Sequence, residues 1–89
     1  MEETTFNGRT ALSLSAEFGH VGVAKILLEN GARFDGLNPS PMELAVRNEN
    51  IFIVDLLLEF GAEPDEKVIK MAEEKGNEII LGLLVNSKN

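Results

Sequence analysis

The sequence predicts an all-α fold, a short solenoid of three helix-turn-helix repeats that form one domain over residues 1–89. Two observations support this prediction. Residues 11–32 carry two apolar segments of helical spacing with a short turn between them, and residues 41–62 repeat this plan thirty positions later. A weaker third copy follows in residues 68–85. Self-similarity at this period is typical of stacked repeats, each of which buries its apolar face against its neighbour.

The first unit spans approximately residues 6–35 and predicts two helices. Its first apolar face consists of Leu12, Leu14, Ser15 and Ala16. Thr10 precedes this face, where its side chain can accept a hydrogen bond from a free backbone amide. Beyond a turn at Gly19-His20, residues 23–28 predict a second, more apolar helix, which Gly31 ends in the left-handed conformation. Helices this close along the chain pack antiparallel.

The second unit, approximately residues 36–65, follows the same plan. Ser40 and Glu43 form an S-x-x-E capping box, with Pro41 in the first helical turn. Asn50 is predicted to cap the next helix, whose apolar residues are Ile53, Val54, Leu56, Leu57 and Leu58. Glu49 stands where the first unit has a glycine, which leaves the conformation of this turn open.

The third unit, approximately residues 66–89, begins after a helix-start signal at Pro64-Asp65. We expect Ile69, Met71 and Ala72 to face the core and Gly76-Asn77 to turn the chain. The last helix, residues 79–85, is apolar on more than one side, whereas a terminal repeat normally has a polar outer face. Three explanations stay open: this end contacts another molecule, further repeats have been removed, or the helix turns to bury itself.

Composition limits the kind of partner. Fifteen acidic and eight basic residues give a net charge of −7, and the basic residues are not clustered, so nucleic acid and anionic membranes are poor candidates. No apolar run approaches the length of a membrane span. The chain has no cysteine, so it has neither a disulfide framework nor a thiolate metal site. This fits an intracellular location, with the cytoplasm as the first expectation.

The residue pattern indicates no catalytic or cofactor site. His20 is the single histidine, with no recognisable nucleophile or metal-ligand set to accompany it. Glu73 and Glu74 are adjacent on a predicted helix and therefore do not face each other. The glycines stand singly at helix ends rather than in a phosphate-binding loop. We therefore expect a non-enzymatic protein without cofactor or metal.

These repeats resemble the ankyrin repeat over about residues 6–85. Residues 8–12 resemble its G-x-T-P-L, residues 15–20 its A-A-x-x-G-H and residues 26–32 its L-L-L-x-x-G-A, and residues 56–62 match the last motif again. The family repeat has about 33 residues. Here Gly31 and Gly61 are 30 positions apart, so we expect shortened finger loops between the repeats.

The resemblance implies a module that binds another protein through the concave surface of its inner helices and loops. Position in the family repeat provides the candidate contact residues. They are Phe6, Asn7, Arg9, Ser13, Glu17 and Phe18 in the first unit, Leu37, Glu43, Arg47 and Asn48 in the second, and Lys70, Glu74 and Lys75 in the third. Phe18 is the favoured anchor, and its alternative is packing over a neighbouring helix. The resemblance also implies that His20 supports its turn, and Phe34 is expected to pack under its loop.

Two further hypotheses stay open beside this one. The chain could be a self-associating, engineered or truncated scaffold with no partner of its own, with weak self-association through the C-terminal helix. Alternatively, its acidity suggests an inhibitor that covers a basic site on a target protein, for which the association rate would fall steeply with salt.

Overall fold

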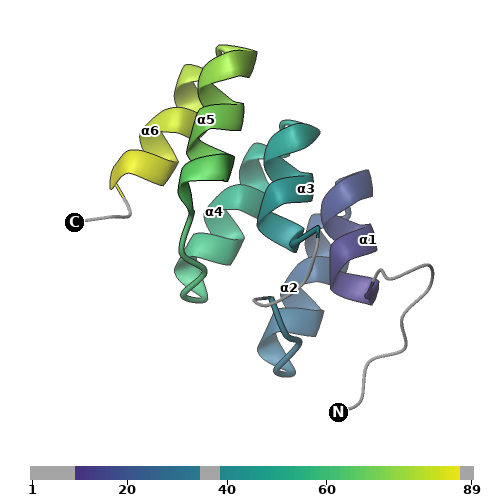
Figure 1. The fold of residues 1–89 in the computed structure, drawn as a ribbon. Coiled ribbons are helices and arrows are strands. Elements are labelled where there is room, and N and C mark those ends of the chain that lie inside the picture. The colour runs from purple at the N-terminus through teal and green to yellow at the C-terminus, as the bar shows by residue number, and fades with distance from the viewer. Residues whose placement is uncertain (1–9, 35–38, 87–89) are drawn as a thin grey trace.

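The computed structural model describes residues 10–34 and 39–86, and all regular structure in these two ranges is helical. The helices are α1 (Ala11–Phe18), α2 (Val21–Glu29), α3 (Pro41–Arg47), α4 (Ile51–Glu59), α5 (Glu66–Lys75) and α6 (Glu78–Asn86). They form three hairpins that stack in chain order (Figure 1). The predicted all-helical solenoid is confirmed. Four candidate contact residues lie outside the described ranges, namely Phe6, Asn7, Arg9 and Leu37.

The hairpins stack in two layers. The first helix of each hairpin belongs to one layer, where α3 packs between α1 and α5, and the second helix belongs to the other, where α4 packs between α2 and α6 (Figure 1). The middle hairpin therefore has a neighbour on each side. Leu44, Ile53 and Leu57 of this hairpin are fully buried. Since helices this short are marginal in isolation, burial of their apolar faces between neighbours holds them in place.

Local side-chain caps start the three helices of the first layer, as predicted. The Thr10 hydroxyl oxygen accepts from the Ser13 amide at 3.1 Å. The Ser40 hydroxyl oxygen accepts from the Glu43 amide at 3.1 Å, and Pro41 occupies the first turn. The Glu43 carboxylate pairs with basic side chains instead of the Ser40 amide, so only this half of the predicted capping box forms. The Asp65 carboxylate accepts from the Val68 amide at 2.9 Å. Each cap satisfies one of the backbone amides that a helix leaves free at its start.

Asn50 occupies the N-cap position of α4, as predicted, but its side chain makes no capping hydrogen bond to that helix. Its Nδ2 instead donates to the carbonyl oxygen of Ala16, which lies in the preceding hairpin. In the third hairpin the equivalent Asn77 does cap: its Oδ1 accepts from the Ile80 amide at 3.0 Å. The Asn50 side chain thus links two hairpins, while its backbone carbonyl starts α4 by accepting from the Val54 amide at 3.0 Å.

The three turns between paired helices share one geometry. Gly19 and Gly76 adopt φ values of 75° and 69°, and Glu49 adopts a φ of 56° at the equivalent position. In each turn the following amide donates back to a carbonyl five residues earlier, as from Asn50 to Ala45 at 2.8 Å. Glu49 therefore forms the same left-handed turn as the glycines, although it has a Cβ.

The last helix buries one face only. Ile80 and Leu84 of α6 lie in the core, whereas Ile79 and Val85 are exposed. Phe34 is partly buried against the core, and the loop under which it is expected to pack lies outside the described residues. Within the described ranges, no helix combines the length and the apolar character that crossing a bilayer would require.

Candidate protein-binding surface

Six candidate residues come together at the C-terminal ends of the first-layer helices. They are Glu17 and Phe18 of α1, Arg47 and its successor Asn48 at the end of α3, and Glu74 and Lys75 of α5. All six are exposed or half-buried. Because α1, α3 and α5 pack side by side and end in equivalent turns, these pairs follow one another along the stack. We call this set the helix-end surface; Lys70 lies near it, exposed in the middle of α5.

Phe18 is the large apolar member of the helix-end surface. Its side chain is 64% exposed, so it does not pack over a neighbouring helix. Its one described ring contact is with His20, whose ring centroid lies 6.5 Å away. His20 itself is exposed and its side chain makes no capping hydrogen bond to α2, so the turn is held by backbone bonds instead. An aromatic ring this exposed offers a contact point for another molecule.

Two candidate residues do not lie on the surface, which corrects the set predicted from sequence. Ser13 is buried in the first turn of α1, where its hydroxyl accepts a hydrogen bond from the Thr10 hydroxyl at 3.1 Å. Glu43 is buried as well, with a side chain only 10% exposed. Both sit at the position of α1 and α3 that neighbouring elements cover, so neither can contact a partner.

The Glu43 carboxylate has a structural role instead. One oxygen lies 2.9 Å from Nη2 of Arg47, one turn along α3, and the other lies 3.3 Å from Nζ of Lys67 on α5. The contact with Lys67 joins the second hairpin to the third. The two cations compensate a carboxylate that has lost most of its water, while their own side chains stay partly exposed.

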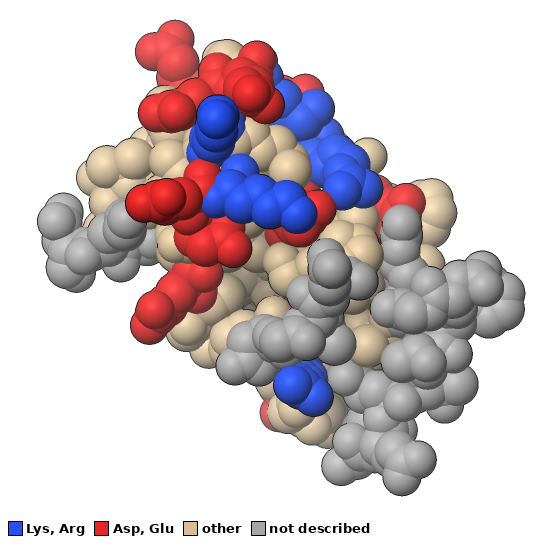
Figure 2. Space-filling view, viewed as in Figure 1, with Lys and Arg blue, Asp and Glu red and all other residues tan. Residues whose placement is uncertain are grey.

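Charge is mixed over α3 and α5. Four of the eight basic residues of the chain belong to these helices: Arg47, Lys67, Lys70 and Lys75. Figure 2 shows basic side chains gathered there among acidic ones. The excess of negative charge is therefore not spread evenly over the surface, and this face presents charges of both signs to a partner.

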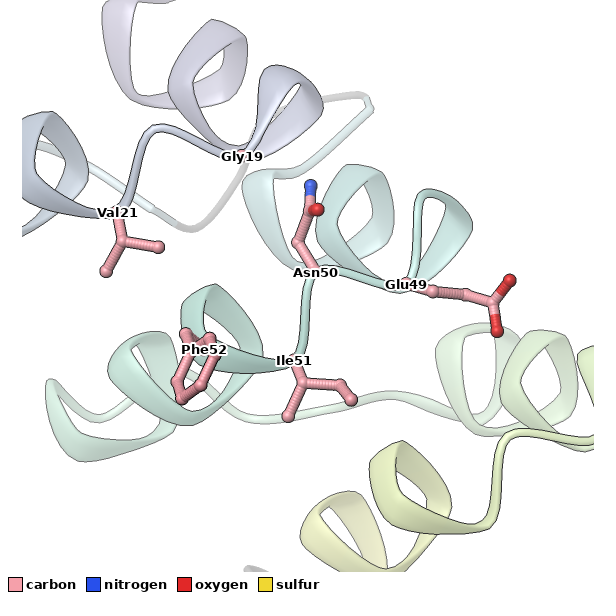
Figure 3. A pocket seen from close by; sticks show the side chains of 6 residues that line it. All are labelled: Gly19, Val21, Glu49, Asn50, Ile51 and Phe52. Atoms are coloured by element: carbon pink, nitrogen blue, oxygen red, sulfur yellow. The ribbon is translucent and has the colours of Figure 1, made fainter.

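A small pocket adjoins the helix-end surface, between the turns of the first two hairpins (Figure 3). It has a volume of about 220 Å³ and is lined by Gly19, Val21, Glu49, Asn50, Ile51 and Phe52. Asn50 points toward Gly19, and Glu49 points away toward the third hairpin (Figure 3). A Cβ at Gly19 would come within 3.2 Å of Asn50 Oδ1. The pocket is below the usual size for a small-molecule site and suits a single side chain.

Sequence reasoning missed Phe52, which lines this pocket and is largely exposed. A signal for it was present. Residues 51–58 are apolar at every position but Asp55, which is more than one helix face can bury. At least one large apolar side chain had to remain at the surface.

No group of three or more His, Asp or Glu side chains is arranged to hold a metal ion in the part of the chain that the structure describes.

Comparison with known proteins places the fold in a family. The family model described as "Ankyrin repeats (3 copies)" matches residues 1–68, which include α1 to α4. A protein named L-asparaginase from Dirofilaria immitis is 37% identical over 60 residues, or 64% of this chain, and the chain covers 10% of the length of that protein. Since the family match covers most of the sequence and the helices stack as repeats, this chain belongs to the ankyrin-repeat family.

Proposed function

We propose that this chain binds another protein through the helix-end surface, with Phe18 as the anchor. Ankyrin repeats are generally protein–protein interaction modules and are typically non-enzymatic. The observation that carries the proposal is the 64% exposure of Phe18, on a surface that also contains charged side chains of both signs. An aromatic anchor within a polar surround is the usual composition of a binding hot spot.

Rigid presentation is the proposed mechanism. The side chains of the helix-end surface stand on α1, α3 and α5; α3 is packed on both sides within its layer, and α1 and α5 each pack on α3 and on the second helix of their own hairpin. Little backbone freedom remains to be lost when a partner binds, so more of the contact energy appears as affinity. The partner would cover Phe18. Its acidic groups would pair with Arg47 and Lys75, and its basic groups with Glu17 and Glu74.

The adjoining pocket extends the same proposal. Gly19 follows Phe18 directly and lines the pocket, so a partner that covers the Phe18 ring can also reach Val21 and Phe52. We propose that one apolar side chain of the partner enters there. We propose further contacts of the family type at the exposed Lys70 and at the candidate residues outside the described ranges, namely Phe6, Asn7, Arg9 and Leu37.

The acidic-inhibitor hypothesis finds less support at this surface. The helix-end surface contains two acidic and two basic side chains, so it has no excess of negative charge for a basic target. The likeness to L-asparaginase covers a tenth of that protein, which is too small a part to carry its activity to this chain. We therefore propose binding, and no reaction, for this chain, within an intracellular setting.

The proposal is tested with Phe18→Ala and a matched control, Phe60→Ala, which removes a less exposed phenylalanine that follows α4. Proteins captured from a cell extract by the wild-type chain are identified by mass spectrometry, purified and titrated against each variant. Loss of a central anchor costs about 2 kcal/mol or more, a decrease in affinity of roughly thirtyfold.

The control should bind as the wild type does, and both variants should keep their helical circular dichroism. Because most of the Phe18 ring is in solvent, its removal should leave the melting temperature within about 3 °C of wild type. Unchanged affinity of Phe18→Ala for every captured partner would refute the proposal.

A further inference from the structure

The apolar side chains of α2 differ in exposure from their counterparts in the other hairpins. Val23 is 51% exposed, whereas Ile53, thirty positions later, is completely buried. Ile26 is 60% exposed, whereas Leu56 is 9% exposed. In the third hairpin the counterpart of Val23 is Ile80, which is also completely buried. The side chains compared are all aliphatic, so the difference in their exposure arises from the helices that surround each position.

The stacking order explains this difference. Both α2 and α4 pack on the first helix of their own hairpin and on the second helix of the hairpin that follows. In addition, α4 packs on α2, which precedes it. Within the described ranges, α2 has no such helix on its preceding side. We call Val23 and Ile26 the head face, since their counterparts Ile53 and Leu56 are buried in α4, which has a preceding helix in its layer.

The other end of the stack shows the complementary pattern. Val85 of α6 is 49% exposed, whereas its counterpart Leu28 of α2 is 5% exposed. Leu81 is half-buried, whereas its counterparts Ala24 and Val54 are completely buried. We call Leu81 and Val85 the tail face. Its counterparts in α2, Ala24 and Leu28, are buried in a helix that has a following neighbour in its layer, namely α4, while Leu58, the counterpart of Val85 in α4, is half-buried.

We propose that copies of this chain associate head to tail, with the tail face of one copy packed on the head face of the next. The occupant follows from the interface that the chain already makes twice, between α2 and α4 and between α4 and α6. A second copy carries the same kind of surface at its end, in the same register. Such a contact continues the internal stacking and is heterologous, because the two copies use different faces.

Charge does not oppose this contact. The described part of the first hairpin, residues 10–34, contains two acidic residues, Glu17 and Glu29, and two basic residues, Lys25 and Arg33. Residues 66–86 contain four acidic and three basic residues. Despite the net charge of −7, the described parts of the two ends that would meet are therefore nearly neutral. A few aliphatic side chains on each face form a small interface, so we expect association at about 10 µM to 1 mM.

The test uses one charged substitution on each face. Ile26→Glu alters the head face and Val85→Glu the tail face, and both positions are exposed enough to accept a charge without loss of fold, which circular dichroism checks. Phe60→Glu is the control, because Phe60 follows α4 and belongs to neither face. Sedimentation velocity is measured for each purified protein over that concentration range.

The wild type and Phe60→Glu should show an average mass that rises with concentration beyond that of a dimer, as an open head-to-tail contact requires. Ile26→Glu and Val85→Glu should each weaken association at least tenfold. An equimolar mixture of these two variants should form a one-to-one dimer and stop there, since one variant retains its tail face and the other its head face. This complementation separates a head-to-tail contact from one between two identical faces.

A wild type that stays monomeric up to 1 mM would overturn the proposal, and is expected if another protein covers these faces. Association that only one of the two charged variants weakens would overturn it as well, and so would a mixture of the two variants that forms no dimer. Phe18 belongs to neither the head face nor the tail face, so Phe18→Ala should self-associate as the wild type does. The binding proposal and this one can therefore fail separately.

Discussion

Glu49 is the non-glycine residue that the described part of the chain holds at positive φ, and replacing it tests the turn geometry directly. Its φ of 56° lies close to the values of Gly19 and Gly76 in the two equivalent turns. A residue with a Cβ pays about 1–2 kcal/mol in this conformation. Glycine avoids that cost but loses more backbone entropy on folding, by about 0.5–1 kcal/mol. Glycine should therefore be better than alanine at this position by about 1 kcal/mol.

The Glu49 side chain has its own contribution, which has to be separated from the backbone effect. Its Oε1 accepts a hydrogen bond from Nδ2 of Asn77 at 2.9 Å, and this contact is exposed. We expect it to stabilise the fold by about 0.5 kcal/mol. Glu49→Ala should lose that amount and keep the backbone cost. Glu49→Gly loses the same hydrogen bond but relieves the backbone, so it should match or exceed the stability of the wild type.

The assay is thermal and urea unfolding of the wild type and the two variants, followed by far-UV circular dichroism. A difference of about 1 kcal/mol corresponds to roughly 4–8 °C in Tm for a domain of this size. The comparison of Gly with Ala isolates the backbone, because both variants lack the hydrogen bond. If Glu49→Gly is no more stable than Glu49→Ala, the left-handed turn at Glu49 is not costly and the reasoning is refuted.

Two further predictions concern stability. Gly82 lies within α6, where an added Cβ would meet open space, so Gly82→Ala should stabilise the fold by about 0.5–1 kcal/mol. Gly76 has a φ of 69°, so Gly76→Ala should destabilise the fold by about 1–2 kcal/mol. Melting curves that move in the same direction for both would contradict this. Lys67→Met and Arg47→Met should each lower the free energy of unfolding by about 0.5–1 kcal/mol, because these cations are partly exposed. The double variant leaves the Glu43 carboxylate unpaired and should lower it by about 3 kcal/mol. Urea unfolding of the three proteins checks this, and purely additive losses would exclude the shared role of the two cations.

The features predicted correctly from sequence depend on residues close along the chain. The caps at Thr10, Ser40 and Asp65 each bond an amide three residues later, so the signal and its effect lie in one short segment. Helical spacing of apolar residues is equally local. The family motifs add the order of stacking, which composition alone would not provide.

The errors concern contacts between distant segments. Asn50 has the position of a cap, but its partner is the Ala16 carbonyl 34 residues earlier. Glu43 has the position of an exposed contact residue, but it pairs with Lys67 of the following hairpin. The sequence does not distinguish a polar side chain that contacts water from one that a neighbouring helix covers.

By itself, the sequence determined that this chain forms short paired helices and where most of them begin and end, because periodicity and capping act within a few residues. Its family motifs also determined that these helices stack as ankyrin repeats. Only the tertiary structure decided which of those side chains stay in contact with solvent. Val23 and Ile53 show the reason: they are aliphatic residues at the same place in two hairpins, yet one is half exposed and the other is buried, because burial depends on the hairpin that packs beside each of them.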